Sequence, residues 1–423
     1  MIQGCLQGKG AKDFGAVEEH LRDRGQEMAR QVLQGVVDAL SVREPVIQNE
    51  RCECGHRYAA LEQRRKTVTT LVGSVEVQRW YYYDRHCGKG KALLDAAWDI
   101  ENTSFSPEVR RCMAHVAAAL PFRPAAEMLA SVGGITVNPK DIERIAAQVA
   151  SAVENIPRHP VPAPTDSVLY VCMDGTGVPM VRRELVGRTG KEPGGEPKTR
   201  EAKLGCFFTQ TTLDAQGHPV RDESSTTYVG AIESAEEFGR RLWTEAQRRG
   251  VETAQKIVAV CDAAPWEWNL IEEYLPGAVQ IIDIWHAREH CWTVARALWP
   301  DNVARQHQWA QIRCKELDAG QTRQVALAIR RLRPRNTMVQ ALCRREADFF
   351  TKNRHRMAYR KFRRKHYFVG SGVLEAGCKT VIGQRLKLAG MHWSVEGANA
   401  IITLRSAIVG ADWPSVPKYA LAA

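Results

Sequence analysis

The stretch of sequence that decides the fold is SVLYVCMDGTGVP, residues 167–179. Its apolar, β-branched run ends in Asp174-Gly175, which predicts a buried strand with an acid at its end, followed by a turn and a second strand. Another strand is expected from Lys203 to Leu213. Residues 186–202, rich in Gly, Lys and Arg, are expected to form a flexible loop before it. The segment therefore begins as consecutive strands.

The same pattern, a strand followed directly by an acid, occurs twice more downstream. Residues 256–261 lead to Asp262 and residues 279–282 lead to Asp283, with a helix expected over 233–249. In α/β sheets, sites assemble at the carboxyl ends of strands. A single Asp there more often caps the next helix, but three such acids favour a site. The element order predicts an α/β fold with an RNase H-like mixed five-stranded sheet.

Such a core needs one more acid from a following helix, and Glu375 is the candidate. It follows the Gly-rich turn in GSGVLE, residues 370–375, where a helix is expected to begin. Metal-dependent phosphodiester cleavage uses two divalent ions, and Mg²⁺ prefers carboxylate oxygens. We therefore expect Asp174, Asp262 and Glu375 to be the catalytic residues and to hold Mg²⁺ or Mn²⁺.

A long segment separates Asp262 from Glu375, and a helical insertion is expected at about 287–365. It contains basic runs such as RRLR (330–333) and RKFRRK (360–365). Arginines of this kind suit contacts to DNA phosphates, while the alternative is a solvated helix face. The nearby acids favour DNA binding.

The region before the sheet contains a helix expected over 14–42 and two cysteine-bearing knuckles within 51–90. The candidate zinc ligands are Cys52, Cys54, His86 and Cys87, in the layout of a zinc ribbon. The pattern departs from a ribbon because the first pair is C-x-C and Asp84 stands where a partner of Cys87 would be. The alternative is a ribbon fold that has lost its metal.

Three helices with tight connections are expected between residues 106 and 150. Gly133-Gly134 should end the second helix, and the third helix should begin at Asn138-Pro139. A helix-turn-helix that enters a major groove has this form, and so does a small bundle that only packs. Four prolines within 156–166 predict a stiff linker and a domain boundary.

Composition agrees with a DNA partner without proving one. Lys and Arg number 59 against 48 Asp and Glu, a formal charge of +11, which favours polyanions or is simply a solvated basic surface. The first residues lack a signal-peptide pattern and no apolar run is long enough to span a bilayer. A cytoplasmic, nucleoid-associated location is therefore expected, with reduced cysteines.

Five short segments occur in a specific order along the chain: MDGT (173–176), CDAAPW (261–266), DIWH (283–286), GSGVLE (370–375) and GMHW (390–393). In this combination the chain resembles bacterial insertion-sequence transposases of the ISKra type, within the DDE transposases related to Mutator-like elements. The resemblance implies the triad Asp174, Asp262 and Glu375, and it implies that Asp283 and His286 form the secondary Asp-x-x-His motif.

The resemblance further implies Mg²⁺-dependent cleavage at the element's ends and strand transfer into target DNA. The partners would be terminal inverted repeats, target DNA and further copies of the chain. His286 would support the site as a catalytic residue; the alternative is that Asp283 caps a helix and His286 is packed. Trp393 is a weaker candidate for stacking on a base.

Two other functions stay open. One is an RNase H-like nuclease that cuts without joining, and the other is a domesticated, non-catalytic DNA-binding protein. The expected organisation is a helical segment at 1–50, a zinc-ribbon-like hairpin at 51–100, a helix-turn-helix-like region at 101–155 and an RNase H-like catalytic domain at 165–423.

Overall fold

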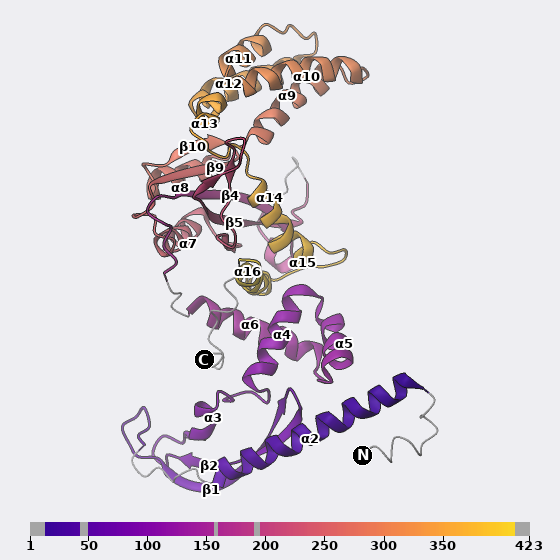
Figure 1. The fold of residues 1–423 in the computed structure, drawn as a ribbon, viewed down its shortest axis with the longest axis vertical. Coiled ribbons are helices and arrows are strands. Elements are labelled where there is room, and N and C mark those ends of the chain that lie inside the picture. Colours follow the sequence, from indigo (N-terminus) through magenta and orange to yellow (C-terminus); the bar gives the residue numbers. More distant parts are fainter. Residues whose placement is uncertain (1–12, 43–49, 156–159, 190–194, 411–423) are drawn as a thin grey trace. The chain divides into compact units, whose positions relative to one another are not determined.

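The computed structural model describes residues 13–42, 50–155, 160–189 and 195–410 (Figure 1). The chain divides into two compact units between residues 156 and 157. The proline-rich stretch expected as a linker lies partly outside the described residues. The remainder is bonded to the second unit, because the backbone N–H groups of Val161 and Ala163 donate to the carbonyls of Arg248 and Arg249.

The first unit begins with a long helix packed on an antiparallel hairpin. These elements are α2 (Phe14–Val42), β1 (Ala59–Thr70), β2 (Gly73–Tyr83), the short β3 (Gly90–Lys91) and α3 (Leu93–Ala97). The side-chain amide of Gln34 on α2 donates to the Glu76 carbonyl and accepts from the Glu76 N–H. Valines opposite each other on the hairpin, Val68 and Val75, form part of the core beneath α2.

The three helices expected after the hairpin are confirmed. They are α4 (Pro107–Ala119), α5 (Phe122–Gly133) and α6 (Pro139–Asn155). The hydroxyl of Ser106 caps α4, and the side chain of Asn138 accepts from the Lys140 N–H at the start of α6. The start of α6 was predictable because its cap, Asn138, is a local feature of the sequence.

The second unit is built on a mixed five-stranded sheet, which confirms the expected α/β class. Its strands are β4 (Val168–Pro179), β5 (Thr199–Gln210), β8 (Thr227–Ala231), β9 (Lys256–Cys261) and β10 (Val279–Ile282). They are arranged in the order β10-β9-β4-β5-β8. The strands β4, β9 and β10 run parallel, whereas β5 is antiparallel to both β4 and β8.

The turn expected after Asp174 is absent from β4, and this part of the prediction was wrong. The strand continues through Asp174 to Pro179 and pairs along its whole length with β5. A Cβ at Gly175 would lie 2.5 Å from Oε1 of Glu201, so this glycine leaves room for a side chain of β5 rather than making a turn. The third strand is instead the short β8, beyond a small hairpin of β6 (Thr212–Leu213) and β7 (Pro219–Val220).

The loop expected over 186–202 is also shorter than predicted, because β5 already begins at Thr199. Residues 190–194 of that segment lie outside the described residues.

Helices cover both faces of the sheet. Gly205 of β5 faces Phe238 and Leu242 of α7 (Ala235–Arg248), whereas Gly230 of β8 faces Leu204 and Ile402 on the other side. Leu204 and Ile402 therefore lie on the face that α16 (Val395–Val409) covers. Before α16 the chain forms α14 (Gly372–Gly377), η4 (Cys378–Gly383) and α15 (Gln384–Leu386). The helix α8 (Pro265–Tyr274) joins β9 to β10 and contacts α7.

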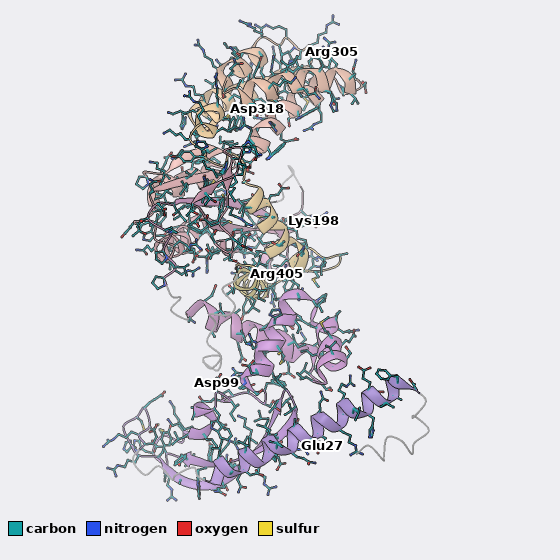
Figure 2. All side chains as sticks on the ribbon, viewed as in Figure 1. Glu27, Asp99, Lys198, Arg305, Asp318 and Arg405 are labelled. Carbon is teal, nitrogen blue, oxygen red and sulfur yellow. The ribbon has the colours of Figure 1, made fainter. Side chains whose placement is uncertain are left out.

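The insertion between β10 and α14 is helical, as expected. Its elements are α9 (Ile284–Leu298), α10 (Val303–Asp318), α11 (Thr322–Arg330), α12 (Thr337–Lys352), η3 (Arg354–Met357) and α13 (Tyr359–Arg363). Asp318, labelled in Figure 2, joins both ends of the insertion by ion pairs with Arg288 and Arg363. None of the helices in the described ranges is both long and apolar enough to cross a membrane.

Candidate active site at the ends of β4 and β9

The register of the parallel strands brings three aspartates to one edge of the sheet. Val171 of β4 pairs with Ala259 of β9, so Asp174 and Asp262, each three residues further on, come to matching positions. The last residues paired between β10 and β9 are Ile282 and Cys261, and each is followed by an aspartate, Asp283 and Asp262. The acids recognised in the sequence at separate strand ends therefore share one edge.

The Asp262 carboxyl lies where a negative charge is disfavoured. Burial, together with the charges of Asp174 and Asp283, raises its pKa to about 6. In the described chain, neither Asp174 nor Asp262 forms an ion pair with a lysine or arginine. Two neighbouring carboxylates without a compensating cation form a site that favours either a proton or a bound cation.

Asp174 is held by its own strand and by the helical segment that crosses the sheet. Its Oδ1 accepts from the Gly175 N–H at 2.6 Å, and its Oδ2 accepts from the Cys378 thiol at 3.4 Å. Burial and the Asp174 charge raise the pKa of Cys378, so the thiol stays protonated and donates. Asp174 is paired with Leu204, and its side chain accordingly points to the face that α14 and α16 cover.

Glu375 stands on a neighbouring element rather than in contact with the two aspartates. It is exposed on α14, three residues before Cys378. Within the described ranges it forms no hydrogen bond or ion pair with Asp174 or Asp262. The structure thus brings Asp174, within β4, and Asp262, directly after β9, to matching positions on neighbouring parallel strands, with Glu375 one turn from the residue that contacts Asp174.

Asp283 is buried, and its hydrogen bonds explain why. One oxygen caps α9 by accepting from the N–H groups of Trp285 and His286, and the other accepts from the N–H of Ser371. Because Ser371 is the N-cap residue of α14, Asp283 fastens the start of the helix that carries Glu375. The Asp283 side chain therefore acts as a helix cap, which was the alternative role expected from the sequence.

His286 lies directly beside Asp262. Its Nδ1 is 3.4 Å from Oδ2 of Asp262, and its Nε2 is 3.2 Å from Nε2 of His290, one turn along α9. Burial, and then the neighbouring His290, lower the pKa of His286, so the ring is neutral over a wider pH range than a free histidine. The other nitrogen of His290, Nδ1, is 2.5 Å from Oε2 of Glu346 on α12.

Three residues of this site were not predicted from the sequence: His290, Glu346 and Glu267. The spacing His286-x-x-x-His290 places two imidazoles on one helix face, and this signal was available. No sequence signal pointed to Glu346, because it lies on α12, far along the chain from His290.

Glu267 sits in the first turn of α8, five residues after Asp262, and is buried. Burial and the charges of Asp262 and Asp174 raise its pKa to about 9. Its Oε2 is buried without a hydrogen-bond partner in the described structure. Carboxylate oxygens are the ligands that Mg²⁺ and Mn²⁺ prefer, although in the described residues Asp174, Asp262 and Glu267 do not bring three ligand atoms within 4.8 Å of one another.

A second candidate metal site lies in the first unit, at the cysteine knuckles. Ligand atoms of Cys52, Cys54, Asp84 and Cys87 all lie within 4.8 Å of one another. The Cys54 thiol donates to Asp84 at 2.9 Å, Cys87 and Asp84 are 3.3 Å apart, and the sulfurs of Cys52 and Cys87 are 3.4 Å apart. This is the one such group of three or more ligands that the described residues contain.

The fourth member of that cluster is Asp84 and not His86, which differs from the expected ligand set. The His86 ring stacks on His56, with centroids 3.8 Å apart, while the His86 N–H donates to Asp84. The thiol of Cys54 and the N–H of His86 lower the pKa of Asp84, which keeps a carboxylate in the cluster. The residues fit Zn²⁺ as three thiolates and one carboxylate.

Trp393 does not face the site. It is buried, its indole N–H donates to the Leu386 carbonyl, and its backbone pairs with that of Pro179 and Val181. It belongs to the packing between β4 and α16, so it is not available to stack on a base.

Comparison with known proteins gives one partial match. Residues 11–185 match an uncharacterised protein family, UPF0236. No curated protein matches the chain. The matched segment includes the cysteine knuckles, the three helices α4 to α6 and β4 with Asp174, so the chain is similar to that family across its first unit and the first strand of its second.

Proposed function

We propose that this protein is a DNA transposase of the DDE type, whose catalytic core is the second unit. The observation that carries the proposal is that Asp174 and Asp262 come to matching positions on neighbouring parallel strands, and that within the described residues neither forms an ion pair with a lysine or arginine. Such carboxylate pairs are what metal-dependent phosphodiester chemistry requires.

The strand order supports the same proposal. In an RNase H-like core, three antiparallel strands are followed by two parallel ones, and the first strand lies at the centre of the sheet. Here β4, β5 and β8 are the antiparallel set, β9 and β10 are the parallel pair, and β4 is central. The central strand carries Asp174 and its parallel neighbour leads to Asp262.

Asp174, Asp262 and Glu375 would hold Mg²⁺ or Mn²⁺. When bound, these ions supply charge stabilisation and an activated nucleophile for phosphodiester cleavage. The protein's own residues fix the geometry. The N–H of Gly175 and the thiol of Cys378 orient Asp174, Asp283 anchors the start of α14, and His286 lies against Asp262.

The proposed reaction has two steps. Hydrolysis at the element's end frees a 3′-OH, which then attacks a phosphodiester of the target DNA. No covalent bond to the protein is formed in either step. The acidic site alone supports the cutting step, and the resemblance in sequence motifs adds the joining step.

We propose DNA as the partner of both units. Helices α10 to α13 carry arginines that suit phosphate contacts, and α4 to α6 form a compact trio compatible with a helix-turn-helix. Zn²⁺ bound by Cys52, Cys54, Asp84 and Cys87 would stabilise the hairpin that precedes these three helices in the first unit. Pairing two element ends would require at least two copies of the chain.

The test uses the full chain, labelled DNA from the regions flanking its own coding sequence, a supercoiled target plasmid and Mg²⁺. Cleavage together with labelled plasmid products supports the transposase. Cleavage without joining favours the RNase H-like nuclease, and DNA binding without cleavage favours the non-catalytic alternative.

A further inference from the structure

The long helix α2 of the first unit is apolar on two faces. One face packs on the hairpin, where Val37 is buried in the hydrophobic core and Leu33 packs against that core (Figure 1). The other face points outward, and its apolar side chains are between 47% and 82% exposed: Phe14, Leu21, Met28, Val32 and Val36. A helix that is apolar all round is normally buried, so a partner is expected for the outer face.

The outer face follows a seven-residue repeat. Phe14, Leu21 and Met28 are seven residues apart, and the residues four positions after Leu21 and Met28 are Gly25 and Val32. Alternating steps of three and four residues are the pattern with which one helix packs against another in a coiled coil. The helix has 29 residues and is about 43 Å long, which gives room for several such repeats.

Two glycines lie in the same stripe, and nothing in the described part of the chain requires them. Gly25 and Gly35 have ordinary helical backbone, and a Cβ at either would meet no side chain and no backbone outside α2 within 4 Å. Glycine within a helix is less favourable than alanine, because it loses more conformational freedom on folding. A glycine at such a position is explained when another helix packs closely against it.

A second copy of α2 fits this face when it lies antiparallel, with a two-fold axis near residue 30. Met28 then meets Val32 of the second copy, and Leu21 meets the small side chain of Ala39. The two glycines meet each other, which lets the backbones approach. Each contact occurs twice because the interface is symmetric, so one stripe supplies both sides.

The charges beside the stripe select this orientation. Arg24 and Asp38 are both exposed and lie along the same side of the stripe. In the antiparallel arrangement, Arg24 of each copy comes opposite Asp38 of the other, which gives two pairs of opposite charge. In a parallel arrangement, Arg24 would lie next to Ala29 and neither pair would form.

We propose that the outer face of α2 joins two copies of this chain as an antiparallel helix pair, with a two-fold axis near residue 30. The inference stands independently of the proposed function, to which the dimer would supply the two copies that hold two element ends.

The test is sedimentation equilibrium of the full chain, without DNA, over a range of protein concentrations. The wild type should be a dimer that dissociates on dilution. Val32→Glu should weaken the dimer about 100-fold, because each copy then places a charge in the apolar stripe. A wild type that stays monomeric would overturn the proposal, and so would a dimer whose dissociation constant Val32→Glu leaves unchanged.

An exchange of charges tests the orientation and the occupant together. Arg24→Asp and Asp38→Arg each create like-charged pairs across the axis and should weaken the dimer about 10-fold, whereas the double variant should restore it. Asp23→Arg alters an exposed residue on the opposite side of the helix from the stripe, and this control should dimerise as the wild type does. A double variant that dimerises no better than the single variants would show that the antiparallel pairing is wrong.

A glycine variant tests the close approach. Gly25→Gln adds a side chain where the single chain has open space, so the Tm of the dilute, monomeric chain should rise. The same side chain should hold two copies apart and weaken the dimer about 10-fold or more. A Gly25→Gln dimer as tight as the wild type would contradict close packing of two copies at this face.

Discussion

Asp174 and Asp262 occupy matching positions on neighbouring parallel strands, and their proximity contributes to a pKa of about 6 for Asp262. Two ionised carboxylates so placed repel each other and lower the stability of the folded chain, and a bound cation would remove this repulsion.

The raised pKa of Asp262 predicts how stability varies with pH. Between its ordinary pKa of 3.8 and about 6, the folded chain binds a proton that the unfolded chain lacks, so this group's contribution to stability falls as pH rises through that window. Asp262→Asn removes the charge. In EDTA, we expect the variant to have a higher Tm than the wild type above pH 6, and the difference to vanish as the pH approaches 4.

The measurement is thermal unfolding followed by fluorescence across that pH range. Adding Mg²⁺ should then raise the Tm of the wild type but not that of Asp262→Asn. A variant that melts below the wild type at neutral pH would show that the carboxylate is stabilised where it lies.

The cysteine cluster predicts one Zn²⁺ per chain, held by Asp84 and not by His86. Asp84→Ala should therefore lose zinc, whereas the matched His86→Ala variant should retain it, because His86 stacks on His56 outside the cluster. Metal analysis of the purified chains reports the stoichiometry, and Co²⁺ substitution reports thiolate ligands. Zinc retained in Asp84→Ala and lost in His86→Ala would restore the ligand set expected from the sequence.

Asp283 should prove to be a structural residue. Asp283→Ala removes the cap of α9 and the bond to Ser371, and we expect it to lower the free energy of unfolding by about 1–2 kcal/mol. Asp283→Asn retains an oxygen for the cap and should lose less. Urea unfolding measures both. If both variants keep wild-type stability yet lose Mg²⁺-dependent cleavage, Asp283 acts in the chemistry directly.

The sequence predicted the features that depend on neighbouring residues. Asp174, Asp262 and Asp283 were found because each follows an apolar run that forms a strand, and the start of α6 was marked by its capping residue Asn138. These patterns are local, so no knowledge of the tertiary fold is needed to read them.

Other features depend on contacts between distant segments. The strand β8 was missed because TYVGA is short, contains a glycine and is buried on both faces, which leaves no alternation to detect. Gly175 was read as a turn, although it accommodates a side chain of β5.

The same limit applies to the site itself. Glu267 looked like an ordinary acid in the first turn of a helix, where negative charge is common. Glu346 reaches His290 only because two helices of the insertion pack together.

The most direct test of the central claim compares Asp174→Asn with Asp166→Asn, which alters an exposed aspartate just before β4 begins. Both chains are assayed for binding to, and Mg²⁺-dependent cleavage of, DNA from the flanks of the coding sequence. We expect both to bind as the wild type does, Asp166→Asn to cut normally and Asp174→Asn to cut nothing. Cleavage by Asp174→Asn at the wild-type rate would contradict the assignment of this edge of the sheet as the active site.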